Sequence, residues 1–428
     1  MVPSRRMLWL VAAGFPAAVA GGLVPALVPA AVFIWVAIAS VTVVDALISR
    51  RLLDRVRIKG PVQTRAHKDR PSKVTIELNA EGLDRLRLAI DWPRSFQSEP
   101  EQRVALPSST ATLEWTFTPR RRGDYAIQAV HLEHGSSLGL WDVRRSAALD
   151  SRVRVYPNLQ NKEDALGLRR EVGFHSRRQV GKGREFEKLR EYLPGDGFDE
   201  IHWKATARRG RPITKVFQIE RTREVYVAID ASRLTSRPAG NETRLERYIT
   251  AALITGAAAQ RNGDKFGLVT FHARMAGFVR AGRGPSHQAV CREAVYRLQP
   301  QKAVPDFDEI ATQLRLQLRG RALIVFLTDL DDPATAEGFR AAARMLNEKH
   351  LVAAAMMRPP HAEPLFTREA GSLDDVYEQL GGHMSWRALK ETEARLRQEG
   401  VRMALLEEAS FTRQLVELYD EIKQRQLL

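Results

Sequence analysis

The chain has 428 residues, of which 44% are hydrophobic and 27% are charged. This composition excludes an intrinsically disordered chain, and the length allows two or three domains with cores of their own. Cys291 is the single cysteine, so an internal disulfide is excluded and a reducing compartment suits the soluble part. The formal net charge of +15 indicates an acidic partner, an anionic membrane surface, or both.

The N-terminal region is apolar enough to cross a membrane. Residues 7–44 contain no charged side chain, and Gly21, Gly22 and Pro25 interrupt this run near its middle. A single spanning helix needs about 20 apolar residues, so the run predicts two short spans, 7–20 and 27–49, joined by a tight turn. We therefore interpret residues 1–50 as a transmembrane helical hairpin.

Basic residues flank both spans: Arg5 and Arg6 precede the first, and Arg50, Arg51, Arg55, Arg57 and Lys59 follow the second. Positive residues stay on the cytoplasmic side, so we expect both ends of the hairpin in the cytoplasm. The alternative is a signal peptide cleaved at the A-x-A site of residues 18–20. The second span would then still stop transfer, so the soluble domains are cytoplasmic in both interpretations.

Residues 51–160 have the pattern of β-strands. Hydrophobic and polar residues alternate at 73–78, 111–118 and 125–134, a turn falls at 119–124, and a last strand at 152–157 closes the set. This spacing predicts an antiparallel sheet or a β-sandwich-like domain. His131 and His134 would point to opposite faces of one strand, so we do not expect them to form a metal site.

From residue 222 onward, apolar strands alternate with helical patterns. Strands are predicted at 224–230, 265–271, 274–281, 321–333, 351–357 and 401–407, and helices at 242–264, 286–298, 307–318, 335–349, 386–399 and 411–426. This alternation predicts an α/β doubly wound, mainly parallel sheet over residues 222–428. Sheets of this kind bind ligands at the carboxyl ends of their strands.

Oxygen-bearing side chains follow two of these strands. Asp230 and Ser232 come after the first strand, and Asp329 comes after an apolar strand later in the chain. Such ligands suit Mg²⁺. The pattern resembles the metal-ion-dependent adhesion site of von Willebrand factor A domains, D-x-S-x-S, although Leu234 stands at the third position and only Ser286 is available in the middle loop. In the alternative interpretation, Asp230 and Asp329 cap loops or helices and bind no metal.

Residues 183–210, between the predicted β-domain and α/β domain, read GREFEKLREYLPGDGFDEIHWKATARRG. This phrase resembles the signature of the bacterial "domain of unknown function 58" family, which precedes a von Willebrand A-like domain of the Rossmann type. The matching residues are Glu185, Phe186, Leu189, Arg190, Tyr192, Pro194, Gly195, Asp196, Ile201, Trp203, Ala205, Ala207 and Arg208. Asp199 stands where the family often has Arg.

The signature lies in a predicted linker, residues 161–221. Its apolar residues, Trp203 among them, are expected on a buried side, and its charged residues are expected to form ion pairs. It is then either a clasp between domains or a docking surface. As candidate partner-binding residues we take Arg190, Tyr192, Asp196, Trp203 and Arg208. His202 has no Ser or Cys nucleophile near it in the sequence, so an enzyme is not expected.

The family resemblance implies a function. It implies a membrane-anchored cytoplasmic scaffold or adaptor in the bacterial inner (cell) membrane. The von Willebrand A-like domain would bind a MoxR-type AAA+ ATPase and other envelope-associated proteins. Mg²⁺ at the degenerate adhesion site would be its cofactor, and no other is expected. The alternative is a basic protein that binds nucleic acid or an anionic membrane surface. Because acidic residues interrupt the basic belt of residues 177–215, nucleic acid is not expected.

Overall fold

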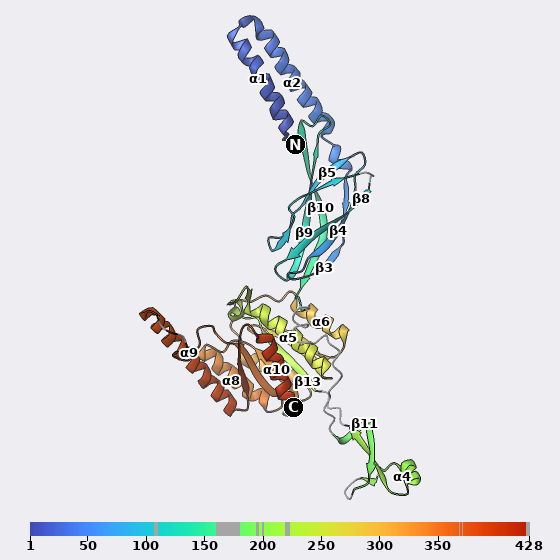
Figure 1. Ribbon diagram of the computed structural model, residues 1–428, viewed down its shortest axis with the longest axis vertical. Helices are drawn as coiled ribbons and strands as arrows, with labels where there is room; N and C mark the ends of the chain where they lie inside the picture. The colour runs from blue at the N-terminus through green and yellow to red at the C-terminus, as the bar shows by residue number, and fades with distance from the viewer. Residues whose placement is uncertain are drawn as a thin grey trace. The chain divides into compact units, whose positions relative to one another are not determined.

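The computed structural model describes residues 1–106, 110–159, 180–193, 197–198, 201–218, 223–367, 369 and 371–424. The chain forms two compact units, Met1–Asn158 and Leu159–Leu428 (Figure 1). The first unit holds two N-terminal helices and a domain rich in strands, and the second holds an α/β domain. The multidomain fold class predicted from the sequence is therefore confirmed.

The N-terminal helices form the predicted hairpin. Helix α1 (Arg5–Leu23) and helix α2 (Val28–Ser49) are joined by the short 3₁₀ helix η1 (Pro25–Leu27). A Cβ atom on Gly14 would lie 3.0 Å from Ile38, so this glycine allows the two helices to pack closely. Both helices are long and apolar enough to cross a membrane, and only 11% and 6% of their most apolar windows are buried.

The strand-rich domain consists of two sheets. One contains β2 (Arg57–Lys59), β4 (Ser72–Asn79), β8 (Thr110–Pro119) and β6 (Phe96–Ser98) in that order. The other contains β1 (Val2–Pro3), β10 (Trp141–Tyr156), β9 (Gly123–Gly135), β5 (Arg85–Ile90) and β7 (Gln102–Ala105), with β3 (Gln63–His67) paired to β10. Inward-facing residues such as Ile76, Trp115 and Val130 are fully buried and form one core.

Strand β10 begins eleven residues earlier than the sequence pattern predicts. It pairs with β9 from Asp142 to Val155, and its register shifts between Ala148 and Ser151. A bulge adds a residue to one strand and changes which face later residues point to. The alternation is therefore broken in the sequence although the strand continues.

A buried joint connects the helical hairpin to the β-domain. The carboxylate of Asp45, in the last two turns of α2, accepts hydrogen bonds from the Ser136 hydroxyl at 2.5 Å and from the Leu138 N–H at 3.0 Å. The Trp141 indole donates to the Thr42 carbonyl at 2.9 Å. Asp45 is only 1% exposed, so its charge is held by these donors rather than by water.

The start of α1 lies in the same joint. The Ser4 backbone N–H donates to the Leu140 carbonyl at 2.9 Å, and the Ser4 hydroxyl donates to the Gly139 carbonyl at 2.6 Å. The β9–β10 loop therefore contacts both helices, at the start of α1 and near the end of α2. These bonds fix the direction in which the hairpin leaves the β-domain.

The α/β domain is built on a six-stranded sheet. Its order is β17 (Met275–Gly282), β16 (Lys265–Phe271), β13 (Glu224–Asp230), β18 (Ala322–Leu327), β19 (Leu351–Met357) and β20 (Arg402–Leu406). All pairs are parallel except that of β17 with β16. The doubly wound sheet is as predicted, and β13, β16 and β19 match the predicted ranges residue for residue.

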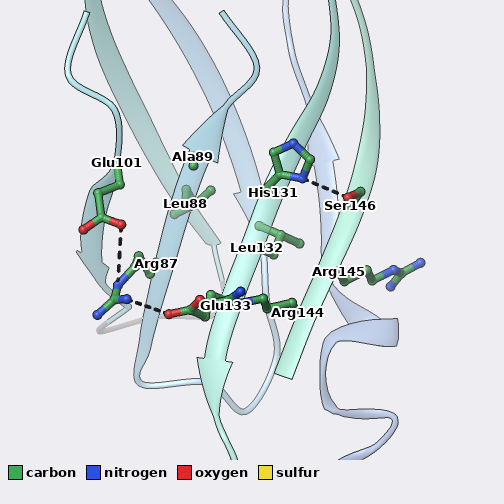
Figure 2. Close-up of a pocket in the computed structure, with 10 residues that line it drawn as sticks. All are labelled: Arg87, Leu88, Ala89, Glu101, His131, Leu132, Glu133, Arg144, Arg145 and Ser146. Atoms are coloured by element: carbon green, nitrogen blue, oxygen red, sulfur yellow. Dashed lines mark hydrogen bonds and ion pairs between the residues drawn. The ribbon is translucent and has the colours of Figure 1, made fainter. Parts of the chain in front are cut away.

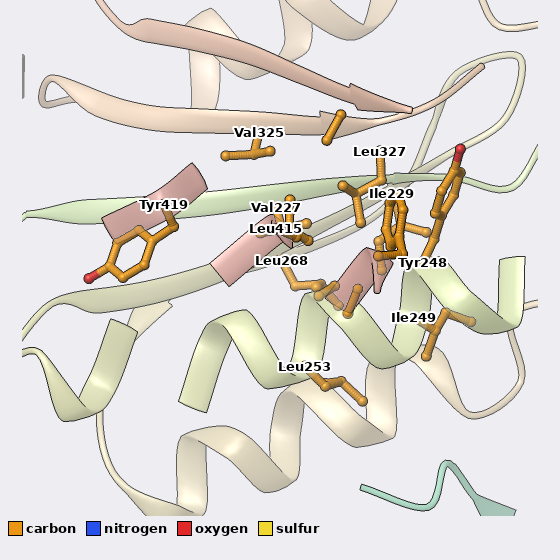
Figure 3. Packing of buried hydrophobic residues seen from close by; sticks show 14 of the residues in the cluster. Val227, Ile229, Tyr248, Ile249, Leu253, Leu268, Val325, Leu327, Leu415 and Tyr419 are labelled. Carbon is orange, nitrogen blue, oxygen red and sulfur yellow. The ribbon is translucent and has the colours of Figure 1, made fainter. Parts of the chain in front are cut away.

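Helices cover both faces of this sheet. One core contains residues of α5 (Arg244–Arg261), α6 (Pro285–Val295) and α10 (Phe411–Gln424), and the other contains residues of α7 (Phe307–Gln317), α8 (Pro333–Asn347) and α9 (Leu373–Gln398). In β13, Val227 and Ile229 point into the first core, while Tyr226 and Ala228 point into the second. Figure 3 shows residues of the first core, among them Val227 and Ile229 of β13 and Tyr248 and Leu253 of α5.

Helix α9 begins thirteen residues before its predicted start. Ser372 and Asp375 form a capping box: the Ser372 hydroxyl accepts from the Asp375 N–H at 3.2 Å, and the Asp375 carboxylate accepts from the Ser372 N–H at 2.9 Å. Two adjacent glycines, Gly381 and Gly382, interrupt the apolar pattern inside the helix. Glycine is unfavourable in a helix interior, so the sequence pattern favoured a later start.

The joint gives a testable prediction. Replacing Asp45 by Ala leaves the Ser136 hydroxyl and the Leu138 N–H without their buried acceptor, which costs about 1–3 kcal/mol for each unpaired group. We expect thermal unfolding of the full chain in detergent to begin several degrees lower. Asp54→Ala is the matched control, because Asp54 is 61% exposed and lies 3.7 Å from Arg145. If Asp45→Ala and Asp54→Ala lower the unfolding temperature equally, the buried joint does not stabilise the chain as proposed.

Candidate functional site

The structure brings the three candidate metal ligands together at one edge of the sheet. Asp230 ends β13, Ser232 follows it, and Asp329 follows the neighbouring strand β18, and all three are 0% exposed. Because β13 and β18 are parallel and paired from Glu224 to Ile229, their carboxyl ends meet at this edge. At two other positions of the adhesion-site pattern, Leu234 is buried and Ser286 lies exposed on α6.

Asp230 holds the two loops of this edge. Its Oδ1 accepts a hydrogen bond from the Ser232 N–H at 2.7 Å, and its Oδ2 accepts one from the Thr328 hydroxyl at 2.7 Å. Burial raises the pKa of Asp230 to about 6, although these hydrogen bonds favour the charged form. This geometry matches the interpretation in which Asp230 closes its own loop.

Asp329 is paired with a buried cation from helix α5. Its Oδ2 lies 2.6 Å from Nη1 of Arg244, and its Oδ1 accepts a hydrogen bond from the Tyr248 hydroxyl at 2.8 Å. The Arg244 side chain is only 6% exposed. Arg244 is the first residue of α5 and Tyr248 follows four residues later, so both side chains leave the same face of the helix.

This pairing bears on the fit of a divalent cation. A Mg²⁺ ion needs about six oxygen ligands and would stand beside the positive guanidinium of Arg244, which repels it. Asp329 would have to leave Arg244 to bind the metal, and a buried guanidinium without a partner is costly. The side chains in this arrangement therefore do not fit Mg²⁺, and metal binding by Asp230, Ser232 and Asp329 stays a prediction.

The sequence reasoning missed Arg244 and Tyr248. Their signal was an Arg and a Tyr four residues apart at the start of the helix that follows Asp230. An Arg in a helical first turn is common on a surface, so nothing in the local pattern indicated that this one is buried. A second ion pair at the edge joins Arg237 to Asp331.

The family signature forms a small hairpin of its own. Strand β11 (Val180–Glu191) pairs antiparallel with β12 (Ile213–Gln218), and helix α4 (Trp203–Arg209) lies between them in the chain. The Tyr192 N–H donates to the Pro212 carbonyl at 3.1 Å. Among the candidate partner-binding residues, Arg190 lies on β11, Arg208 is exposed on α4, and Asp196 lies outside the described residues.

The predicted burial of Trp203 is wrong. Its side chain is 66% exposed at the first position of α4, whereas Ile201 and Ile213 next to it are buried. A seven-residue helix on two strands has room for few buried side chains, and these two isoleucines fill it. His202 caps α4, because its Nδ1 accepts a hydrogen bond from the Ala205 N–H at 3.1 Å. The exposed indole leaves Trp203 as a candidate partner contact.

A shallow pocket of about 430 Å³ lies on the sheet of β5, β9 and β10 (Figure 2). Glu133 in this pocket forms two ion pairs: its carboxylate oxygens lie 2.6 Å from Nη1 of Arg87 and 2.7 Å from Nε of Arg144. His131 lies 2.9 Å from the Ser146 hydroxyl. Because both arginines already pair with the Glu133 carboxylate, we do not expect this pocket to bind the phosphate groups of nucleic acid.

A known protein family matches the part of the chain that contains Asp230 and Asp329. The family described as "Protein of unknown function DUF58" matches residues 188–375. The matched residues, here called the DUF58 region, make up less than half of the chain. The uncharacterized protein YeaD of Bacillus subtilis (strain 168) is 26% identical over 162 residues. That match covers 36% of this chain and 36% of YeaD, so it spans about a third of either protein.

Solved structures resemble single parts of the chain. The conserved hypothetical protein BatB from Bacteroides thetaiotaomicron is 14% identical, with a TM-score of 0.30, and the match covers 47% of this chain and 99% of BatB. The SpRpn10 VWA domain is 11% identical, with a TM-score of 0.29, over 46% of this chain and 94% of that domain. In this chain, the strand order and the helices on both faces of the sheet define a doubly wound α/β domain.

The DUF58 region contains most of the candidate site residues. It takes in α4, β12 and the α/β domain as far as the start of α9, so Trp203, Asp230, Arg244 and Asp329 all fall inside it. The N-terminal helices and the β-domain lie outside it. The buried edge and the signature hairpin are thus parts of one family region.

The buried edge predicts a pH dependence of stability. The folded-state pKa of Asp230, about 6, lies above its ordinary value of 3.8, so the folded chain binds an extra proton between these values. The extra proton on Asp230 therefore adds to the free energy of unfolding below about pH 4, and this contribution is lost as the pH rises to about 6. We expect the unfolding free energy of wild type, relative to Asp230→Asn, to fall by roughly 3 kcal/mol over this range.

Urea unfolding of the fragment 159–428 at several pH values measures this difference. Asp332→Asn is the matched control, because Asp332 is exposed and hydrogen bonds from Thr335 lower its pKa. The contribution of Asp332 is lost only as the pH falls below its ordinary range, so this control should change little between pH 4.5 and 6. A difference for Asp230→Asn that is independent of pH would contradict the burial of a charged Asp230.

Proposed function

We propose that this protein is a membrane-anchored scaffold or adaptor of the bacterial inner membrane, with its β-domain and von Willebrand factor A-like domain in the cytoplasm. The A-like domain binds a protein partner, and a MoxR-type AAA+ ATPase is the partner we propose. The signature hairpin, with Arg190, Tyr192, Asp196, Trp203 and Arg208, provides contacts for this partner. Other envelope-associated proteins are its further partners.

The observation that carries the anchor is the uncovered apolar surface of α1 and α2. Side chains such as Trp9, Phe15 and Phe33 are 66–77% exposed. Apolar surface of this extent on two helices of spanning length is stable in a bilayer rather than in water. The Asp45 joint supports the same proposal, because it connects these helices directly to the first soluble domain.

Binding rather than catalysis fits the groups that this chain offers. Cys291, the single thiol, is buried, and burial raises its pKa to about 11, so the reactive thiolate is scarce at neutral pH. The carboxylates of Asp230 and Asp329 are held by neighbouring side chains. We propose that the protein has no enzymatic activity and that Mg²⁺ binds weakly or not at all to the isolated chain.

Co-purification tests the proposed partner. The tagged full chain, expressed in its host membrane with a MoxR-type ATPase from the same genome, should retain the ATPase. Trp203→Ala removes an exposed aromatic contact and should weaken retention about tenfold or more, since an aromatic at the centre of an interface often contributes about 2 kcal/mol or more. Val62→Ala, at an exposed apolar site in the β-domain, is the matched control.

Location must be established in the same cells. A reporter fused after residue 428 should be active when it requires the cytoplasm and inactive when it requires the periplasm. Strong periplasmic activity would contradict the cytoplasmic assignment. An ATPase that fails to co-purify with a correctly located chain would contradict the partner alone.

A further inference from the structure

A second open pocket lies on the β-domain, beside the turn between β8 and β9. Its volume is about 710 Å³, within the range of roughly 300–1,000 Å³ that small-molecule sites usually have. Its wall is formed by residues 93–97 and by residues of the turn, and it includes Arg94, Arg120 and Arg121. Among the described residues that line it none is acidic, so the pocket wall carries a net positive charge.

Two of these arginines have no carboxylate beside them. Arg94 and Arg121 are exposed, and in the described part of the chain neither forms an ion pair. The pocket of Figure 2 differs, because its Glu133 carboxylate already pairs with Arg87 and Arg144. Cations gathered in a concave place without acids among them raise the local concentration of anions. The second pocket therefore favours an anionic ligand.

The third arginine fixes the shape of the pocket. Nη2 of Arg120 donates to Oε1 of Gln97 at 2.7 Å, and Nη1 lies 3.2 Å from Oδ1 of Asp69. The Arg120 backbone N–H donates to the Ser95 carbonyl at 2.8 Å. These bonds join the turn to the segment around β6. The backbone segments that carry the two unpaired arginines are therefore held next to each other.

An aromatic side chain gives the pocket an apolar side. The Tyr125 hydroxyl donates to the Arg121 carbonyl at 3.2 Å, which holds the ring against the turn. The Tyr125 ring packs edge-on against Phe96, with 4.9 Å between the ring centroids. Both side chains line the pocket, and Tyr125 is only partly buried. An organic group attached to the anion would therefore contact an aromatic surface.

We propose that this pocket binds a small phosphate ester. Arg94 and Arg121 bind its phosphate group, and Tyr125 contacts its organic part. The terminal oxygens of a phosphate group accept hydrogen bonds from two guanidinium groups at once. A carboxylate has fewer oxygens, and one bidentate arginine occupies both of them. Two unpaired arginines in one pocket therefore suit a phosphate better than a carboxylate.

The position of the pocket argues against a lipid headgroup as the ligand. Strand β9 runs for 13 residues, from Gly123 beside the turn to Gly135 beside the joint with the N-terminal helices. At about 3.3 Å per residue, this strand separates the pocket from the joint by about 40 Å. The inference rests on the proposed membrane anchor for this step alone. Lipid headgroups then lie at the joint, so the pocket takes its phosphate from a soluble molecule.

Isothermal titration calorimetry on the full chain in a neutral detergent tests the site. Phenyl phosphate should bind at one site per chain. Arg94→Gln and Arg121→Gln should each weaken this binding about tenfold or more, since each removes hydrogen bonds to a charged group. Arg103→Gln is the matched control, because Arg103 is exposed on β7 outside the pocket and forms no ion pair within the described residues. Each variant should keep the unfolding midpoint of the wild type.

Further probes decide the chemistry of the ligand. Benzoate has the same ring with a carboxylate, and inorganic phosphate has no organic part, so each should bind several-fold more weakly than phenyl phosphate. The proposal is overturned if phenyl phosphate does not bind, if Arg94→Gln binds it as well as Arg103→Gln, or if benzoate binds equally well. Tighter binding of a short-chain phosphatidylglycerol would overturn the assignment to a soluble ester. The assay contains neither ATPase nor bilayer, so its failure would leave the proposed adaptor function standing.

Discussion

The burial of strand β13 on both faces is the constraint on which the α/β domain depends. Every residue from Val225 to Asp230 is buried, so the sheet needs a helical layer on each side. Because the whole strand is buried, the carboxylate of Asp230 at its carboxyl end is also shielded from water. The neighbouring parallel strand β18 places the carboxylate of Asp329 at the same edge. Buried charges need partners, and the helix that covers this end supplies Arg244 and Tyr248. At the place that resembles a metal site, the charge of Asp329 is thus balanced by Arg244 of the same chain.

A related requirement shapes the other unit. Asp45 lies in the last two turns of the largely apolar helix α2, where this helix meets the β9–β10 loop. A carboxylate at this place is tolerated because Ser136 and Leu138 donate to it. The N-terminal helices and the β-domain therefore share a buried polar contact. The proposed anchor and the proposed scaffold belong together because this contact joins the helices to the β-domain.

Much of the fold follows from sequence pattern, and the remainder depends on contacts distant in the chain. Strands β13, β16 and β19 are apolar runs bounded by turn signals, so their ranges were predictable. The full length of β10 was not, because a bulge between Ala148 and Ser151 breaks its alternation. Asp230 and Asp329 could be placed together from the topology of a parallel sheet. The inward turn of Arg244 and the exposure of Trp203 have no local signal, since tertiary packing decides both.

We propose that Arg244, and not a metal ion, balances the charge of Asp329. A double-mutant cycle on the fragment 159–428 measures this directly through the unfolding free energy. Arg244→Ala should cost about 3–5 kcal/mol because it leaves a buried charge unpaired, and adding Asp329→Ala should recover part of that loss. Millimolar Mg²⁺ should leave wild-type stability unchanged. Additive effects of the two substitutions, or a clear stabilisation of the wild type by Mg²⁺, would contradict the account.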